Sequence, residues 1–84
     1  MVRKGIFKQL RRGVDAVESA TGPLEALASA RELRLAAEAL ELELVVELRE
    51  LRWTWSEIGR VYGTSKQGAQ QRFRSAVTRE RAHR

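Results

Sequence analysis

Residues 53–73, WTWSEIGRVYGTSKQGAQQRF, constrain the fold most. This stretch contains two signals for the start of a helix and one signal for the end of a helix. Thr54 and Glu57 have the spacing of a capping box, in which the first residue caps a helix and the second reaches back to it. Gly63 ends that helix, because glycine takes the left-handed C′ conformation without the penalty of a Cβ atom. Ser65, or less favourably Thr64, then caps a second helix.

A helix, a tight turn that contains glycine and a second helix together predict a helix-turn-helix. We place this motif at residues 53–79. If Ser65 caps the second helix, Ala69 and Phe73 are expected to face inward.

The run EIGRVYGTSKQGAQQRF resembles the helix-turn-helix of sigma-factor region four and of small bacterial regulators similar to it. The resemblance covers about a quarter of the chain. It implies that Ile58 is the apolar residue of the first helix, that Gly59 lets the two helices approach, and that Gly63 is the turn glycine. It also implies that Ala69 and Phe73 are core residues of the second helix.

Two positions depart from the pattern of these proteins. Thr64 stands where a branched apolar residue is usual, and Gly68 lies inside the second helix. Glycine at such a position costs up to about 1 kcal/mol of helix stability relative to alanine. Both departures affect the packing of the second helix more than the motif itself.

The formal net charge of +5 is unevenly distributed along the chain. Residues 1–20 carry five basic and two acidic residues, residues 21–50 carry three and seven, and residues 51–84 carry eight and two. The most basic segment therefore coincides with the predicted helix-turn-helix. This coincidence favours phosphate binding over a merely solvated basic surface.

Length and composition exclude several classes of protein. A chain of 84 residues is too short for two independent cores, so we expect a single helical domain. The chain has no cysteine, and its one histidine, His83, falls in an expected disordered tail. Nucleophilic catalysis needs a serine or cysteine beside a positioned base, so we expect no enzyme activity and no cofactor or metal. We also expect no membrane span and a cytoplasmic, nucleoid-associated location.

Residues 1–20 predict an amphipathic helix. Its apolar side chains fall within an arc of about 100°, and they are Ile6, Phe7, Leu10, Val14 and Val17. Gly5 and Gly13 weaken this helix. Its other face is basic, through Lys4, Lys8, Arg11 and Arg12. Packing on its own domain or on a partner is favoured over binding to a membrane surface.

Residues 23–52 predict one long helix, because Pro23 suits a first helical position and the stretch is rich in strong helix formers. It would be about 45 Å long. Its apolar residues form two opposed stripes. One stripe consists of Leu33, Ala37, Leu40, Leu44, Leu48 and Leu51, and the other of Leu35, Ala39, Leu42 and Val46, flanked by Val45.

A helix that is apolar on two faces must be covered on both. The helix-turn-helix can cover one face, and the other needs the N-terminal helix or a second subunit. We expect a homodimer, since so short a partner helix cannot easily cover so long a rod. The expected dimer contacts are Leu35, Leu42, Val45 and Val46. A monomeric bundle completed by the N-terminal helix is the alternative.

The predicted second helix of the motif carries candidate DNA contacts. Its outward residues are expected to read bases, because glutamine pairs with adenine and lysine or arginine with guanine. These residues are Lys66, Gln67, Gln70, Gln71 and Arg74. Contacts to the DNA phosphates are expected from Arg60, Ser65, Arg72 and Arg79. A basic tail at residues 80–84 adds further arginines.

Aromatic residues at the joint between helices have two interpretations. Trp53, Trp55 and Tyr62 could stack on bases, but two tryptophans at such a joint are more often core residues, and we expect them in the core. Trp53 and Ile58 also have the spacing of a hydrophobic staple across the first cap.

These patterns together predict an all-α bacterial transcriptional regulator that binds double-stranded DNA specifically through its helix-turn-helix. One alternative is a helical module that binds RNA polymerase or another regulator without reading DNA. A second alternative is a non-specific nucleoid-type DNA binder. The dependence of affinity on salt separates the first alternative from the two DNA-binding interpretations, and preference among DNA sequences separates those two.

Overall fold

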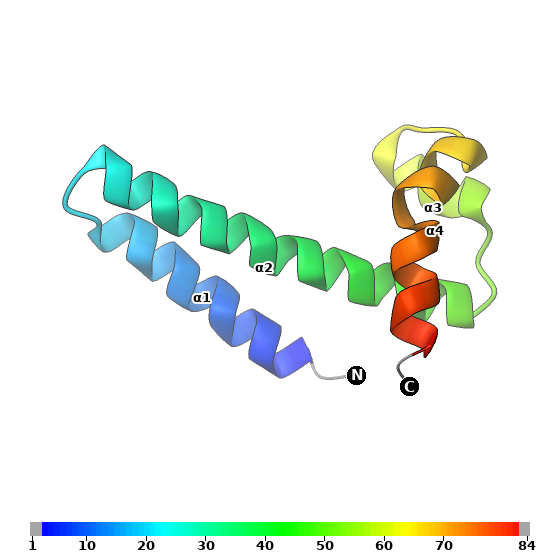
Figure 1. The fold of residues 1–84 in the computed structure, drawn as a ribbon, viewed down its shortest axis with the longest axis horizontal. Helices are drawn as coiled ribbons and strands as arrows, with labels where there is room; N and C mark the ends of the chain where they lie inside the picture. Colours follow the sequence, from blue (N-terminus) through cyan, green and yellow to red (C-terminus); the bar gives the residue numbers. More distant parts are fainter. Residues whose placement is uncertain (1–2, 83–84) are drawn as a thin grey trace. The chain divides into compact units, whose positions relative to one another are not determined.

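The computed structural model describes residues 3–82, which form four α-helices and no strand. The all-α prediction is confirmed. The helices are α1 (Arg3–Ser19), α2 (Pro23–Glu50), α3 (Trp55–Tyr62) and α4 (Lys66–Ala82) (Figure 1). None of these four helices combines the length and the apolar character needed to cross a bilayer. His83, for which the sequence predicts a disordered tail, lies outside the described residues.

The contacts between residues divide the chain into two units, and the boundary lies inside α2 between Glu41 and Leu42. We call the first the hairpin unit, which consists of α1 and of α2 up to Glu41. The second is the head unit, which consists of the end of α2 with α3 and α4. All the buried hydrophobic side chains of the described residues belong to the head unit.

The turn between α1 and α2 is held by the first turn of α2. Pro23 is the first residue of α2, as predicted. The Glu25 carboxylate accepts hydrogen bonds from the Thr21 hydroxyl (2.6 Å) and from the Thr21 backbone N–H (3.2 Å). These two bonds, the hydroxyl bond first, lower the pKa of Glu25 below its ordinary value. The ionised carboxylate therefore ties the turn to the helix start.

In the hairpin unit, α1 and α2 lie side by side and antiparallel (Figure 1). Half-buried residues recur every three or four positions on both helices, which is the spacing of a narrow helix–helix seam. Gly13 lies at its centre: a Cβ atom there would be 3.0 Å from the Leu33 side chain. The glycine thus permits close approach and sets the register. The seam residues include Ile6, Leu10, Gly13 and Val17 of α1 and Ala26, Ser29, Leu33, Ala36 and Leu40 of α2.

The apolar arc predicted for α1 is only partly covered. Phe7 and Val14 remain 41% and 46% exposed. A single neighbouring helix covers only a narrow stripe, and these two side chains flank it.

Helix α2 ends two residues earlier than predicted. Arg52 has a φ of 69°, a left-handed conformation that stops the helix at Glu50. The Arg52 N–H donates to the Arg49 carbonyl (3.0 Å) and the Trp53 N–H to the Leu48 carbonyl (2.9 Å). This is the hydrogen-bond pattern of a Schellman motif. Arginine adopts a positive φ much less readily than glycine does. The run of strong helix formers therefore did not predict that the helix ends here.

The core of the head unit is built from three helices. The end of α2, α3 and α4 all contribute, and the buried residues are Val45, Val46, Trp55, Ile58, Ala69, Phe73 and Val77. The partly buried side chains of Leu42, Leu48 and Tyr62 pack against this cluster.

Two of the predicted dimer contacts are core residues instead. Val45 and Val46 are 3% and 1% exposed within the chain itself. They face α3 and α4 in the head-unit core, so a second subunit has no access to them, and this part of the prediction is wrong. Leu42 packs against the same core and is partly buried. Leu35 remains 38% exposed.

The two tryptophans at the joint have different environments. Trp55 is 7% exposed, as predicted for a core residue, whereas Trp53 is 47% exposed and the prediction for it is wrong. Trp55 shares the inner face of α3 with Ile58, three residues on. Trp53 precedes the helix and lies on the linker, where its carbonyl accepts a hydrogen bond from Arg49 (2.6 Å). The Arg49 guanidinium also lies 4.7 Å from the centre of the Trp55 ring.

Candidate nucleic-acid interface

Helix α3 begins at the predicted cap. The Glu57 backbone N–H donates to the Thr54 hydroxyl oxygen (3.1 Å), and this hydroxyl donates to the Glu57 carboxylate (3.0 Å). Thr54 itself has the extended conformation expected of an N-cap. The predicted cap is confirmed. The Glu57 carboxylate interacts with the side-chain hydroxyl of the cap residue Thr54.

Helix α3 ends at the predicted glycine. Gly63 has a φ of 64° and a ψ of 30°, in the left-handed region. Its N–H donates to the Arg60 carbonyl (3.3 Å), and the Thr64 N–H donates to the Gly59 carbonyl (2.9 Å). These are the two bonds of a Schellman motif, here with glycine at the left-handed position. The turn is therefore closed by backbone hydrogen bonds.

Gly59 is needed by the turn. A Cβ atom at this position would lie 2.7 Å from the Thr64 carbonyl oxygen and 3.0 Å from that of Ser65. Both neighbours are backbone atoms, which cannot move aside without opening the turn. The resemblance implied that Gly59 lets two helices approach, and the structure shows that it is the turn backbone that approaches α3.

Helix α4 is capped by Ser65. Its hydroxyl oxygen accepts a hydrogen bond from the Gly68 backbone N–H (3.2 Å), so Ser65 rather than Thr64 is the cap residue. The two departures from the regulator pattern meet at this point. A Cβ atom at Gly68 would overlap the Thr64 hydroxyl. The absence of a side chain at Gly68 therefore leaves space for the Thr64 hydroxyl. The two departures from the pattern are thus linked by one contact.

The inner face of α4 holds the helix against the core. Ala69 and Phe73 are 1% and 7% exposed, which confirms that they face inward, and Val77 continues the same face. The ring of Phe73 also lies 5.4 Å from that of Tyr62 at the end of α3. These contacts determine which side of α4 faces solvent.

The predicted base-reading residues lie mostly on that solvent side. A shallow depression of about 310 Å³ is lined by four of the predicted base-reading residues, Gln67, Gln70, Gln71 and Arg74, and by Ser75, which was not predicted. Gln70 is half-buried at its edge, whereas Lys66 is exposed in the first turn of the helix. Ser75 could have been found from its spacing, because it follows Gln71 by four residues.

The predicted phosphate contacts do not form one cluster. The Arg72 guanidinium lies 4.6 Å from the centre of the Tyr62 ring and 5.0 Å from that of Phe73, a cation–π arrangement that places it beside the end of α3. Arg60 is exposed on the last turn of α3. Arg79 lies about two turns beyond Arg72, beside Leu42 and Glu80.

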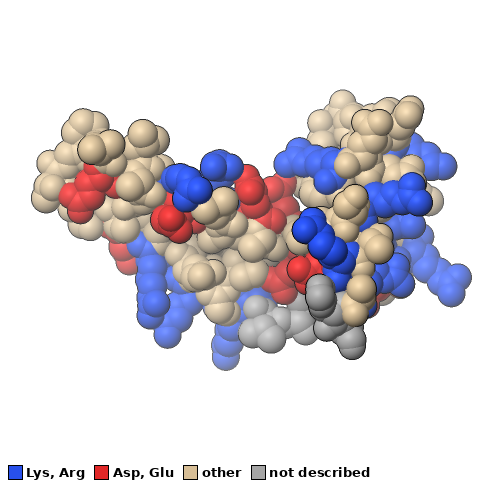
Figure 2. Space-filling view, in the orientation of Figure 1, with Lys and Arg blue, Asp and Glu red and all other residues tan. Residues whose placement is uncertain are grey.

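The charge of α4 is strongly positive. The helix carries five basic residues and one acidic residue, Glu80, which lies near its end. Figure 2 shows lysine and arginine side chains gathered over the α4 part of the head unit. The first fourteen residues of the helix contain no acid, so its polar side has no built-in repulsion toward phosphate.

Comparisons with models of known protein families, with curated proteins and with solved structures found no match. Among the described residues, no three histidine, aspartate or glutamate side chains come together as a metal site would require.

Proposed function

We propose that the head unit binds double-stranded DNA as a helix-turn-helix, with α4 as the recognition helix. One observation carries the proposal: the solvent side of α4 presents Gln67, Gln71 and Arg74 together, while the opposite side is anchored in the core. Glutamine and arginine are the side chains best suited to reading adenine and guanine edges in the major groove.

The dimensions and order of the elements support this function. A helix of 17 residues is about 25 Å long and fits the major groove of B-DNA. Recognition helices contact bases with their N-terminal residues, and the proposed base-reading residues lie within the first nine positions of α4. Lys66 and Gln70 complete the proposed base-reading set from the start and the edge of this surface.

Phosphate contacts are proposed for the residues that flank the recognition surface. Arg72, held against Tyr62, presents a guanidinium beside the turn, and Arg60 and Ser65 lie before and after the turn. Arg79 would reach the backbone further along α4. Such contacts set orientation and affinity without reading sequence.

The resemblance to sigma-factor region four and similar regulators supports a role in bacterial transcription, in the cytoplasm and at the nucleoid. Regulators of this kind read inverted repeats when they act as two-fold dimers, with half-sites about 34 Å apart or a multiple of that distance. We propose that this chain acts as such a homodimer.

The first experiment is a selection of bound duplexes from a random library, followed by affinity measurements over a range of salt concentrations. We expect an enriched sequence and a steep loss of affinity as salt rises. A flat salt dependence together with capture of RNA polymerase or another regulator would favour the adaptor function instead. A steep dependence without any enriched sequence would indicate a non-specific binder.

Variants of α4 test the assignment of residues. Gln71→Ala should weaken binding to the selected site by about 1–3 kcal/mol and relax the preference at one base pair. Arg74→Ala should weaken it as well, whereas Arg34→Ala, which removes the same charge from an exposed position on α2, should change it little. Equal losses on selected and random duplexes would assign Gln71 to the DNA backbone.

A further inference from the structure

The hairpin unit has no core of its own. No residue from Arg3 to Glu41 is buried, although α1 and the part of α2 in this unit are regular helices. Two helices side by side share one stripe each, and most of the stability of a helix in a protein comes from the packing of its apolar face. The apolar side chains outside the seam therefore need a second layer.

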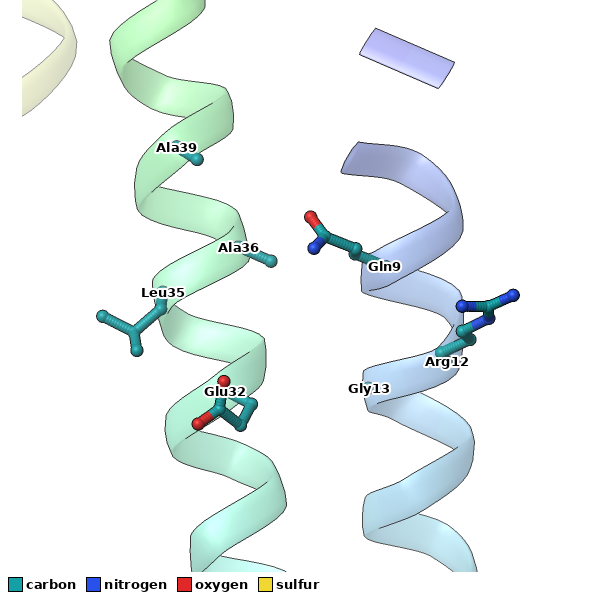
Figure 3. A pocket seen from close by; sticks show the side chains of 7 residues that line it. All are labelled: Gln9, Arg12, Gly13, Glu32, Leu35, Ala36 and Ala39. Carbon is teal, nitrogen blue, oxygen red and sulfur yellow. The ribbon is translucent and has the colours of Figure 1, made fainter. Parts of the chain in front are cut away.

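One face of the hairpin unit carries a groove suited to such a layer. Its volume is about 440 Å³, and its floor consists of small residues from both helices, Gly13, Ala36 and Ala39. Leu35 stands beside this floor and is 38% exposed. Figure 3 shows the groove with Gln9 directed toward α2 and Leu35 on the far side of α2 from α1. Small residues allow another helix to approach closely, and Leu35 adds an exposed apolar side chain at the outer margin of this surface for that helix to cover.

The margins of the groove carry opposite charges. Arg12 lines it from α1 and Glu32 lines it from α2. Glu32 has an ion pair with Arg31 at 3.4 Å, but both side chains are mostly exposed, so this pair contributes little. The net charges of the two helices differ in the same way, since α1 is basic and this part of α2 is acidic. α1 carries five basic and two acidic residues, whereas residues 23–41 of α2 carry two and four.

We propose that this groove binds the same groove of a second copy of the chain, so that two hairpin units form a four-helix bundle. A two-fold axis parallel to the helices would place α1 of each copy over α2 of the other. Such an axis preserves the level of each residue along the bundle. Gly13 faces Leu33 and the helices are antiparallel, so Arg12 and Glu32 of the second copy differ in level by only about 3 Å. Their long side chains can span this offset, and the same pair forms twice.

The head unit of the same chain is a poorer occupant. Its apolar residues are already used in its own core, and the solvent side of α4 is polar. A second copy supplies both the apolar side chain and the complementary charges. In this bundle the dimer contact lies in the hairpin unit and not at Val45 and Val46, as predicted from the sequence. Leu35 is the one predicted dimer contact that the bundle retains. It does not depend on DNA binding.

Sedimentation equilibrium of the full chain without DNA tests the main point. We expect a dimer at micromolar concentration. A monomer at high micromolar concentration would overturn the proposal and leave the proposed DNA-binding function standing, since a monomer can still bind a single half-site.

Two charge reversals test the contact itself. In Arg12→Glu, positions 12 and 32 at the margins of the groove are both acidic. In Glu32→Arg, both positions are basic. Each should raise the dissociation constant of its own dimer by roughly tenfold or more, because like charges then face each other twice. An equimolar mixture of the two variants should associate as tightly as the original chain, because both contacts in the mixed dimer are attractive.

The mixture separates contacts between chains from contacts within one chain. If Arg12 and Glu32 interacted only inside a single hairpin, mixing could not restore association, and that result would overturn the proposal. Unchanged association of either single variant would overturn it as well. Circular dichroism should show full helicity for both variants, since both side chains are exposed.

An apolar pair on α2 provides a matched control. Leu35→Glu puts a charge beside the groove and should abolish the dimer at micromolar concentration. Leu27→Glu makes the same change at a position that is 66% exposed and lies outside the groove, and it should leave the dimer intact. Equal effects of the two substitutions would place the contact elsewhere and contradict the proposal.

Discussion

The hairpin unit and the head unit are both built from helices with apolar stripes, yet among the described residues only those of the head unit enclose a core. In the hairpin unit, Phe7 and Val14 are as apolar as Phe73 and Val77 in the head unit, but they remain nearly half exposed. The difference lies in the number of helices that meet. Three helices converge in the head unit, so one side chain can be covered from several sides. Apolar content alone does not produce burial.

The largest expected effect comes from the two phenylalanines. Phe73→Ala should cost about 3–5 kcal/mol of the free energy of unfolding, because a cavity remains in a small core. Phe7→Ala should cost about 1 kcal/mol or less, because its ring is 41% exposed. Urea unfolding followed by circular dichroism measures both, because both units are helical. Equal costs would mean that the hairpin unit packs as tightly as the head unit.

Glycine substitutions should change sign between the units. Gly59→Ala should destabilise the chain by about 1–3 kcal/mol, because its Cβ atom would press on the carbonyls of the turn. Gly5→Ala should stabilise it by up to about 1 kcal/mol, because Gly5 lies in a helix with open space around it. Thermal melts of the two variants check the signs. A neutral Gly59→Ala would show that the turn can open without cost.

The left-handed arginine at the end of α2 offers a smaller test. Arg52→Gly should stabilise the chain by about 1 kcal/mol, because glycine adopts a positive φ without a steric penalty. The same substitution inside the exposed part of α2, Arg31→Gly, should destabilise it by about 0.8–1 kcal/mol through lost helix propensity. If Arg52→Gly also destabilises, the packing of the arginine side chain outweighs its backbone strain.

The Thr64 and Gly68 pair should show coupling. Alanine is favoured over glycine inside a helix by about 1 kcal/mol. Gly68→Ala alone should raise the free energy of unfolding by less than this amount, because the new Cβ atom displaces the Thr64 hydroxyl. In a Thr64→Ala background the same substitution should gain that amount in full. A double-mutant cycle from unfolding measurements gives the coupling free energy, and strict additivity would show that the two departures are unrelated.

The smallest effect is a pH dependence at the turn of the hairpin unit. Hydrogen bonds from Thr21 lower the pKa of Glu25 in the folded chain. The stabilisation is therefore fully present above the pKa of the unfolded chain and is lost as the pH falls through the lower, folded-state value. Thr21→Val removes the hydroxyl bond and should raise the pKa of Glu25 toward its ordinary value, as followed by NMR titration. An unchanged titration would mean that the backbone N–H alone holds the carboxylate.

Local signals determined much of this structure. The caps at Thr54 and Ser65, the stop at Gly63 and the start at Pro23 each depend on one to four neighbouring residues. Capping and left-handed turns are short-range chemistry, so they can be recognised without knowing the fold. The inward phase of Ala69 and Phe73 follows from helical periodicity for the same reason, and the polar outer side of α4 follows from that phase.

Tertiary structure decided whether several other apolar residues became core. By sequence, Val45 and Val46 belong to the apolar stripe predicted to contact a second subunit, but they are buried in the core once α3 and α4 pack on the end of α2. Trp53 and Trp55 look alike in sequence, and the entry into α3 exposes one and buries the other. Arg52 adopts a left-handed conformation that nothing in its neighbours requires. In each case the outcome depends on partners distant in sequence or on backbone strain that the whole fold sustains, and no local pattern carries that information.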